Sequence, residues 1–475
     1  MAHHNTISHD PQKENFTFGG GLKKMSIIFI ILGIIGMVWA YFGHTENHHS
    51  RFWSNFLLNT YYFNGIAISA VFLVAAHSIG YGGWQTILKR VFESFGYFVF
   101  ITVIFFLIIV IGMWLDWHSL YHHWTHAPET DTIVGDKKAF LNKNMFTFIV
   151  IFFSALWMFG VVLMRRHSLN EDNAKDPIKH NQTAKYKSAA YIVIFGVTTS
   201  IFSWVAIMSL DPHWYSTLFG WYNFASYMCA FLSFAILIVT YLKYKGHLVN
   251  VTESHLHNLS LFLFGFSVFY TYLWFSQFML IWYGNIPEDT MYFVKRFNVP
   301  LFKVLFFVTF IINFIFPFFF FLRRNAKRNF WIMNIAAVIL IFGHYLDFYL
   351  MVMPEPNAIS EHASHDDHHA SLNKVLSASA KIENEKTVLD SASNDAVKVS
   401  TDVVVDHKDH SHEAASSHSK HGNSTTLASF GIIEIFIFLG FIGLFIYTVM
   451  TVLSKNRIVP PTSNPFFKES LNHNY

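Results

Sequence analysis

Ionisable side chains within or next to apolar segments are the residues of this chain best suited to chemistry. A charged group in a membrane span is costly, so such residues are normally kept for function. Carboxylates and imidazoles can relay protons, because their surroundings shift their pKa values readily. We predict eight proton-path candidates: His77, Asp116, His118, Asp211, His213, His344, Asp347 and Glu434.

Two pairs among these candidates have informative spacing. His344 and Asp347 are three residues apart, which places them on one face of a helix. Asp211 and His213 occupy a short connection between two apolar segments. No acidic residue falls near the middle of a predicted span, so a proton path would consist of two half-channels joined by a conformational gate. The structural alternative is that Asp211 and His213 cap helix ends, while the other pair joins helices by hydrogen bonds.

Quinol binding is a second chemistry that the same region suggests. A quinol site needs aromatic side chains that hold the ring and a His or carboxylate that accepts each proton. His118, Asp211, His213, Trp214 and Tyr215 could supply these groups. The competing explanation is an aromatic belt at headgroup level, formed by the rings of residues 214–222. No catalytic triad, phosphate loop or zinc spacing stands out, so we predict no catalytic residue and no metal ligand.

The composition identifies the kind of element that must position these residues. The chain has 475 residues, of which 53% are hydrophobic and 13% charged, with 54 Phe. A soluble domain carries about 25% charged residues, so this composition indicates a polytopic membrane protein. A single cysteine, Cys229, excludes an internal disulfide and a Cys-ligated iron–sulfur cluster within the chain.

Ten apolar segments are long enough to cross a bilayer core of roughly 30 Å. Lipid cannot satisfy open backbone groups, so each segment must be a helix, and the predicted fold is an all-α polytopic membrane protein. The predicted spans are residues 25–42, 57–79, 95–115, 146–164, 191–209, 218–242, 259–283, 301–322, 332–353 and 430–453.

The distribution of Lys and Arg predicts the orientation. About twenty lie at one set of span ends, whereas about seven lie at the opposite short ends. Because cytoplasmic ends carry the excess of positive charge, both termini are predicted to be cytoplasmic. Asp211 and His213 would then face the periplasm.

An internal repeat predicts how the spans are grouped. Four residues, Trp53, Leu57, Tyr61 and Phe63, precede Trp214, Leu218, Tyr222 and Phe224 by one constant offset. We interpret this as a duplication that produces two four-helix bundles of the same orientation. The predicted segments are a cytoplasmic N-terminal segment (1–24), a flanking helix with its outer loop (25–53), two bundles (54–210 and 211–353), a loop (354–426), and a last flanking helix with a cytoplasmic tail (427–475).

Residues 354–426 differ from the rest in being rich in Ser, Ala, Asp, Lys and His. This composition predicts a disordered periplasmic loop. His and Asp at such density can bind a transition metal. Their spacing repeats no coordination pattern, however, which favours a solvated tether.

Two motifs resemble a known family. Residues 210–217 read Leu-Asp-Pro-His-Trp-Tyr-Ser-Thr, and residues 274–288 read Trp-Phe-Ser-Gln-Phe-Met-Leu-Ile-Trp-Tyr-Gly-Asn-Ile-Pro-Glu. Both are similar to NrfD-like (polysulfide-reductase) membrane subunits, and most to the ActF-type subunit of bacterial alternative complex III. That complex is a quinol:cytochrome c oxidoreductase of respiratory electron transport. The resemblance covers nearly the whole chain and implies two four-helix bundles in the bacterial inner membrane.

The resemblance also implies partners and cofactors. It implies a quinol-binding sister subunit, ActC, an iron–sulfur subunit, c-type cytochrome subunits and often a terminal oxidase. Haem and iron–sulfur clusters would belong to those partners, quinol would be the substrate of the complex, and this chain would bind no cofactor.

One departure from the family pattern affects the expected role. Quinol-binding relatives have a His-x-Gly-Arg-Pro-like turn after the third span, whereas residues 116–120 here read Asp-Trp-His-Ser-Leu. Assembly and proton conduction are therefore the expected roles of a non-catalytic subunit. The alternatives are that the chain itself oxidises quinol, or that it is a stand-alone secondary transporter with parallel repeats.

Overall fold

The computed structural model describes residues 16–43, 46–128, 130–354 and 430–471, and all regular elements in these ranges are helical. Ten helical segments are long and apolar enough to cross a membrane. The prediction of an all-α polytopic membrane protein is therefore confirmed. The predicted His-rich loop lies outside the described residues from position 355 onward.

Several spans contain more than one helical element. The elements in chain order are α1 (Gly20–Gly43), α2 (Glu46–Ile79), η2 (Gly83–Ile87), α3 (Lys89–Gly96), α4 (Val99–Trp114), α5 (His122–Thr125), α6 (Thr132–Lys137), α7 (Lys143–Asn170), η3 (Glu171–Asn173), α8 (Pro177–Ala206), η4 (Met208–Leu210), α9 (Leu218–Tyr244), α10 (Glu253–Gly284), α11 (Pro287–Asn298), α12 (Pro300–Phe310), η5 (Ile311–Ile315), α13 (Phe316–Phe321), α14 (Arg324–Arg328), α15 (Phe330–Val352), α17 (Ile432–Ser454) and α18 (Phe467–Leu471).

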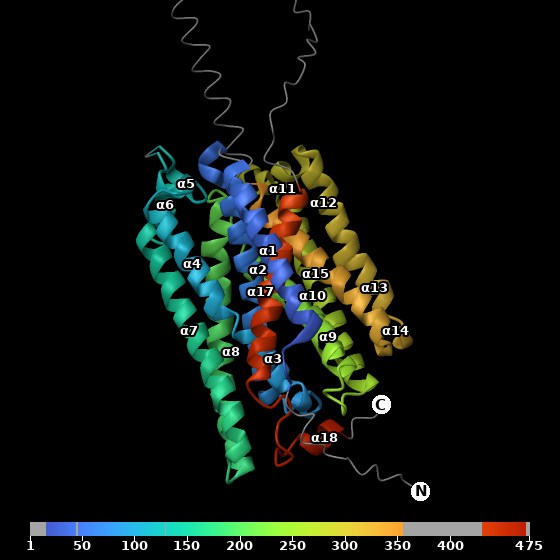
Figure 1. The fold of residues 1–475 in the computed structure, drawn as a ribbon. Coiled ribbons are helices and arrows are strands. Elements are labelled where there is room, and N and C mark those ends of the chain that lie inside the picture. Colours follow the sequence, from blue (N-terminus) through green and yellow to red (C-terminus); the bar gives the residue numbers. More distant parts are fainter. Residues whose placement is uncertain (1–15, 44–45, 129, 355–429, 472–475) are drawn as a thin grey trace, which may run out of the picture. The chain divides into compact units, whose positions relative to one another are not determined.

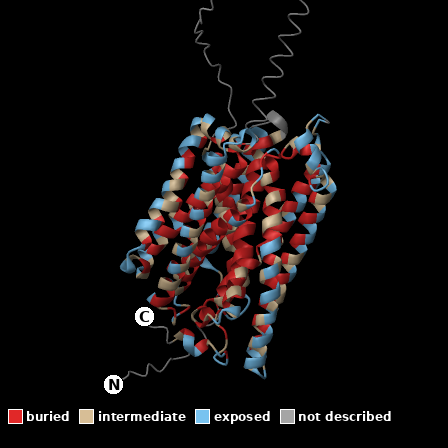
Figure 2. Ribbon diagram, turned by 180° about the vertical axis from the view of Figure 1, so that it is seen from behind, coloured by how far each residue is buried: buried red, intermediate tan, exposed pale blue. Residues whose placement is uncertain are grey.

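Two sets of helices pack around a common centre (Figure 1). In the first set, α2 contacts α4 and α8, while α7 contacts both of these neighbours. In the second set, α9 contacts α10 and α15, and the span from α12 to α13 contacts both of those. These corresponding contacts are what a duplication would produce. The helices α2, α9 and α15 also contact one another, and they are the most buried spans (Figure 2).

The structure corrects the predicted boundary at residues 53 and 54. Helix α2 begins at Glu46, so residues 46–53 are helical where a loop was predicted. Helix α8 likewise begins at Pro177, well before the predicted start of its span. The physical reason is that hydropathy marks only the apolar part of a helix. Polar turns at either end continue the same backbone hydrogen bonds.

The two ends of the bundle differ in what they carry (Figure 1). We call the end where α1 begins and α17 finishes the N-face, and the end that carries α5, α6 and α11 the loop face. The predicted orientation, with the N-face in the cytoplasm, stays a prediction.

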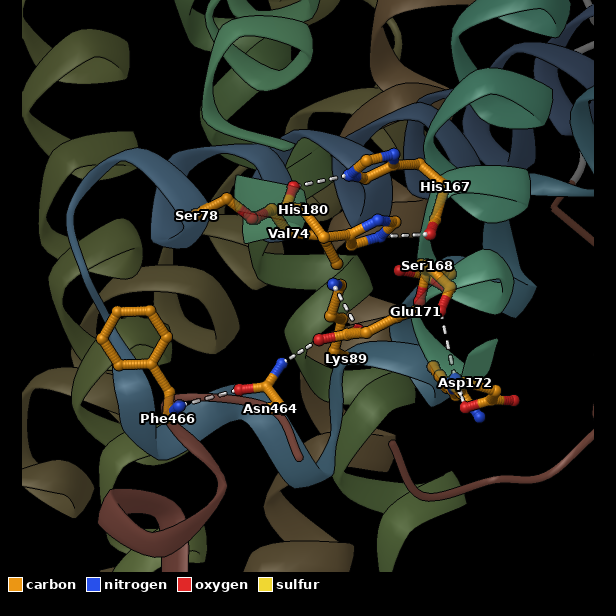
Figure 3. A network of polar contacts seen from close by, with 12 residues as sticks. Val74, Ser78, Lys89, His167, Ser168, Glu171, Asp172, His180, Asn464 and Phe466 are labelled. Carbon is orange, nitrogen blue, oxygen red and sulfur yellow. Dashed lines mark hydrogen bonds and ion pairs between the residues drawn. The ribbon is translucent and has the colours of Figure 1, made fainter. Parts of the chain in front are cut away.

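A polar network fixes the C-terminal tail at the N-face (Figure 3). The buried Arg90 of α3 pairs with Asp172 at 2.6 Å and donates to the carbonyls of Ser168 (3.1 Å) and Val459 (3.2 Å). The Asn464 amide donates to the Glu171 carboxylate, as Figure 3 shows. These contacts join the tail to α3 and to the end of α7.

The two flanking helices, α1 and α17, pack along each other through glycines. A Cβ atom on Gly33 would lie 2.4 Å from the Cα of Gly440, and one on Gly443 would lie 2.6 Å from the Ser26 carbonyl oxygen. Close backbone approach of this kind drives helix association in lipid, where the hydrophobic effect between helices is missing. The glycines therefore set the distance between α1 and α17.

We expect Gly440→Ala to destabilise the protein by about 1–3 kcal/mol, because the added methyl group has no space against Gly33. Thermal unfolding of the detergent-purified chain measures the change. Gly265→Ala in α10 is the matched control, since its Cβ would meet nothing within 4 Å. Equal melting temperatures for the two variants would contradict close packing of α1 and α17.

Candidate functional site

The carboxyl group of Asp347 is buried at the centre of the second helix set, with 2% of the residue exposed. Its Oδ1 accepts from the Tyr222 hydroxyl, and its Oδ2 accepts from the Ser226 hydroxyl at 3.2 Å. Both donors lie on α9, four residues apart and hence on one face. Among the residues that the structure describes, no ion pair involves Asp347.

His344 is hydrogen-bonded to Ser226, which in turn bonds Asp347, so Ser226 connects the two residues. The Ser226 Oγ lies 2.9 Å from His344 Nδ1. A hydroxyl has one proton, so when Ser226 donates to Asp347 it must accept from Nδ1–H of His344. His344 Nε2 then holds a lone pair, and this buried atom has no partner among the described residues. The order His344, Ser226, Asp347, Tyr222 is thus a short hydrogen-bonded chain.

A π-helical turn supplies a further polar side chain beside this chain. Element η5 interrupts the eighth span and buries Asn313, whose Nδ2 lies 3.5 Å from the Tyr270 hydroxyl. The Tyr270 ring meets the His344 ring edge-on at a centroid distance of 4.8 Å. Gly343 allows this approach, since a Cβ there would lie 2.2 Å from Asn313 Oδ1. Single π-helical turns occur frequently at functional sites.

A small cavity of about 30 Å³ borders Asp347 on the side of α10 and α11. Tyr222, Gln277 and Arg296 also line it, and the Gln277 Oε1 is buried without a partner among the described residues. A volume near 30 Å³ is about the share of one water molecule in the liquid. The site therefore combines a buried carboxyl group with space for water and one lining residue, Gln277, whose side-chain oxygen has no partner among the described residues.

The connection between η4 and α9 covers this cavity at the loop face. The Trp214 ring stacks on Tyr292 of α11 at a centroid distance of 3.9 Å, and Tyr292 lines the cavity. Lys295 pairs with Asp211 at 2.9 Å, while the adjacent Arg296 donates to the Leu350 carbonyl at 3.0 Å. Helix α11 thereby links the partly buried Lys295–Asp211 ion pair to the cavity.

The predicted aromatic belt is only partly correct. Tyr215 and Trp221 are exposed, whereas Trp214 and Tyr222 are buried within the protein. The physical reason is that each buried ring has a specific partner: Trp214 stacks on a tyrosine, and the Tyr222 hydroxyl bonds a carboxylate. Sequence position alone did not distinguish lipid-facing rings from protein-facing ones.

His213 and Asp131 are hydrogen-bonded on the loop face, with Nε2 and Oδ2 2.8 Å apart. Asp131 also caps α6, because its carboxylate accepts from the Val134 amide. Lys137, at the end of α6, donates to the Pro212 carbonyl at 2.6 Å. These contacts attach α6 to the connection that contains Asp211 and His213, so both predicted residues help hold the loop face together.

His118 and Asp116 occupy a separate place on the loop face. The His118 ring bonds the Ile109 carbonyl at 2.9 Å and borders a cavity of about 200 Å³. Asp116 also borders it and pairs with Lys143 at 3.2 Å; the hydrogen bond from Lys143 lowers the pKa of this carboxyl. Asp211, His213, Trp214 and Tyr215 do not line this cavity. The predicted quinol-binding residues therefore lie in two separate places: His118 borders this cavity, and the other four residues do not.

Glu434 forms a bidentate ion pair with Arg51, with distances of 2.8 and 2.9 Å. Both side chains are buried, and the carboxylate also accepts from the Gly431 amide at the start of α17. This proton-path candidate therefore connects α17 with α2. His77, at the other end of α2, bonds the Leu73 carbonyl at 2.9 Å and packs against Trp84.

Sequence reasoning missed several partners in this site. Ser226 and Tyr270 have no distinguishing feature in the sequence, although Ser226 follows Tyr222 by four residues on the same helical face. In the sequence, Arg296 was only one of about seven basic residues at the less positively charged set of span ends. Among the described residues, no group of three or more His, Cys, Asp or Glu could hold a metal ion.

Comparison with protein-family models and with curated proteins finds no match for this chain. The resemblance to NrfD-like and ActF-type subunits consequently stays a prediction from the two motifs.

We expect Glu434→Gln to destabilise the folded protein by about 3 kcal/mol, because the buried Arg51 guanidinium would lose this bidentate carboxylate. The melting temperature in detergent measures the effect. A second variant, Arg51→Met with Glu434→Leu, should recover much of the loss, since it removes both charges. Glu253→Gln is the control, because its pair with Arg328 is exposed and should matter little. Wild-type stability of Glu434→Gln would contradict a supporting role for the pair.

Stability should also depend on pH through His123, which lies on the loop face. Burial and the nearby Lys295 ammonium lower the pKa of His123 to about 4. The unfolded chain, with an ordinary pKa near 6.5, binds more protons between these values, so stability falls as pH drops from about 6.5 to about 4. Allowing for partial exposure, we expect a loss of about 2 kcal/mol.

Thermal unfolding at pH 7 and pH 5 checks this for the wild type and for His123→Gln. Other histidines titrate in the same range, so the informative quantity is the difference between the two proteins. The variant should lose less stability than the wild type. An identical loss in both would show that His123 keeps an ordinary pKa.

Proposed function

We propose that this chain is an integral membrane subunit of a quinol:cytochrome c oxidoreductase of the alternative complex III type. In that complex it supports assembly and conducts protons through the second helix set, with Asp347 as the buried proton carrier. Haem and iron–sulfur centres belong to partner subunits. The chain itself performs no redox step.

The hydrogen-bonded chain at Asp347 is the observation that carries this proposal. A carboxyl group in a membrane span without an ion pair is costly, and such groups mark proton relays. Here one oxygen faces a tyrosine hydroxyl and the other faces a serine that leads to His344. Each of these side chains can both give and accept a proton, or exchange it through water in the adjacent cavity.

The route toward the loop face passes through that cavity. Gln277 and Arg296 line it together with Asp347. Next to Arg296 in α11, Lys295 forms the partly buried ion pair with Asp211. The Arg296 guanidinium can supply a counter-charge when Asp347 is ionised. Protons would therefore enter or leave beside the connection that carries Asp211.

The route toward the N-face is interrupted in this conformation. Buried serines follow α9 and α10 in that direction, but Ser233, Ser260 and Ser267 each bond a carbonyl four residues earlier in their own helix. His344 Nε2 has no hydrogen-bond partner among the described residues, so the hydrogen-bonded chain ends at this atom. This arrangement supports two half-channels that meet at a gate.

Quinol oxidation by the chain itself is less well supported. The residues proposed for it do not share one cavity, and His118 already bonds a backbone carbonyl. The motifs at 210–217 and 274–288 support membership of the complex, because both lie beside the Asp347 site: Trp214 covers it, and Gln277 lines it.

Asp347→Asn tests the proton role. In the assembled complex reconstituted in vesicles, proton release per electron should fall by about half or more while quinol:cytochrome c turnover persists, because an amide cannot carry the proton. A pH-sensitive dye and cytochrome c absorbance measure the two quantities. The matched control is Glu288→Gln, an exposed carboxylate on α11. Unchanged proton stoichiometry in assembled Asp347→Asn complex would leave only the assembly role.

Membership of the complex requires a separate experiment. We expect mild-detergent purification from native membranes to yield this chain together with an iron–sulfur protein and a c-type haem band in the visible spectrum. This chain can supply neither centre, so both must come from partners. A haem-free protein without partners would contradict the complex and favour the transporter.

A further inference from the structure

A cavity of about 480 Å³ lies at the N-face between the end of α9 and the beginning of α15. It takes no part in the site around Asp347. Its volume is in the range of sites that hold a small organic molecule. The cavity is lined by Leu237, Thr240, Tyr241, Lys243, Tyr244, Phe330, Trp331 and Asn334.

The lining separates into an apolar part and an aromatic rim. Leu237 lies nearly two helical turns before the end of α9, on the side of the membrane interior. Tyr244 and Trp331 stand at the rim and are 80% and 77% exposed. Amphipathic rings in such positions lie at the headgroup level of a bilayer. The cavity is therefore placed where a lipid headgroup meets its acyl chains.

Two polar atoms in the lining have no protein partner. Thr240 Oγ1 and Asn334 Oδ1 are buried, and neither has a hydrogen-bond partner among the described residues. The side chains of Thr240 and Asn334 therefore add polar groups to a lining that is otherwise mainly apolar and aromatic.

Basic side chains predominate around the cavity. The Lys243 Nζ lies 5.7 Å from the centre of the Phe330 ring, and the Lys245 Nζ lies 5.8 and 5.9 Å from the rings of Tyr241 and Tyr244. Arg324 belongs to α14, which ends two residues before Phe330, whereas Arg328 of the same helix is paired with Glu253. Among the residues that the structure describes, no acidic side chain lines the cavity. The surroundings therefore attract an anion.

We propose that this cavity binds the headgroup of an anionic phospholipid from the surrounding membrane. The phosphate lies toward Lys243 and Lys245, and an acyl chain runs along Leu237. Basic pockets between transmembrane helices hold anionic headgroups in this way. The site is independent of the proton role of Asp347, so either proposal can fail without the other.

Photo-cross-linking of the unmodified full-length chain provides the first test. The probe is phosphatidylglycerol with a photoreactive acyl chain, in detergent micelles, followed by peptide mapping. Label should concentrate in residues 237–244 and 330–334 and be displaced by unlabelled phosphatidylglycerol, but not by phosphatidylcholine or inorganic phosphate. Label spread over other spans, or equal displacement by phosphatidylcholine or by a short-chain quinone, would overturn the proposal.

Charge variants provide the second test, with retained phosphatidylglycerol measured by native mass spectrometry. Each removed cation should weaken binding about fivefold, so Lys245→Gln should lower retention by that factor and the Lys243→Gln, Lys245→Gln pair by about twentyfold. Lys245→Gln is the safer variant, because Lys243 also donates to the Val251 carbonyl. Lys175→Gln, an exposed charge between η3 and α8, is the matched control. Equal retention by Lys245→Gln and the control would contradict the site.

Discussion

The burial of one carboxyl group, that of Asp347, is the constraint on which the second helix set depends. A carboxyl inside a membrane must be satisfied by neighbouring donors. That requirement brings α9 against α15, since Tyr222 and Ser226 must reach both oxygens. It also places His344, one helical turn before Asp347 in α15, within hydrogen-bonding distance of Ser226. The contact between α9 and α15 therefore depends on hydrogen bonds to Asp347 as well as on side-chain packing.

The first helix set is held together by other buried polar contacts. Tyr61, which the repeat equates with Tyr222, donates to Asn223 of α9 at 3.3 Å. Its set is held instead by a buried ion pair nearer the N-face, in which Arg165 of α7 bonds Glu93 of α3 at 3.0 Å. The two sets therefore share helix contacts but differ in buried chemistry. One set thus contains a buried ion pair, and the other contains the candidate proton carrier.

Most of the proton-path candidates are bonded to a partner side chain of their own. These partners explain why the candidates do not form a continuous proton path. Asp211, Asp116 and Glu434 each pair with a Lys or Arg, and His213 bonds the carboxylate of Asp131. A paired group at the loop face can hold helices and loops in position while remaining close to water. Asp347 differs because hydrogen bonds and not a cation satisfy it. This contrast singles out one member of a set that the sequence presented as equivalent.

The sequence by itself determined the class of fold, the number of spans and the pairing of His344 with Asp347 on one face. These features follow from local rules: apolar length sets a span, and helical periodicity sets a face. Helix ends such as that at Glu46 escaped prediction, because polar turns outside the bilayer leave no hydropathy signal. Only the tertiary structure decided which helices meet. It alone showed that Ser226 bridges His344 and Asp347, since that contact joins residues more than a hundred positions apart.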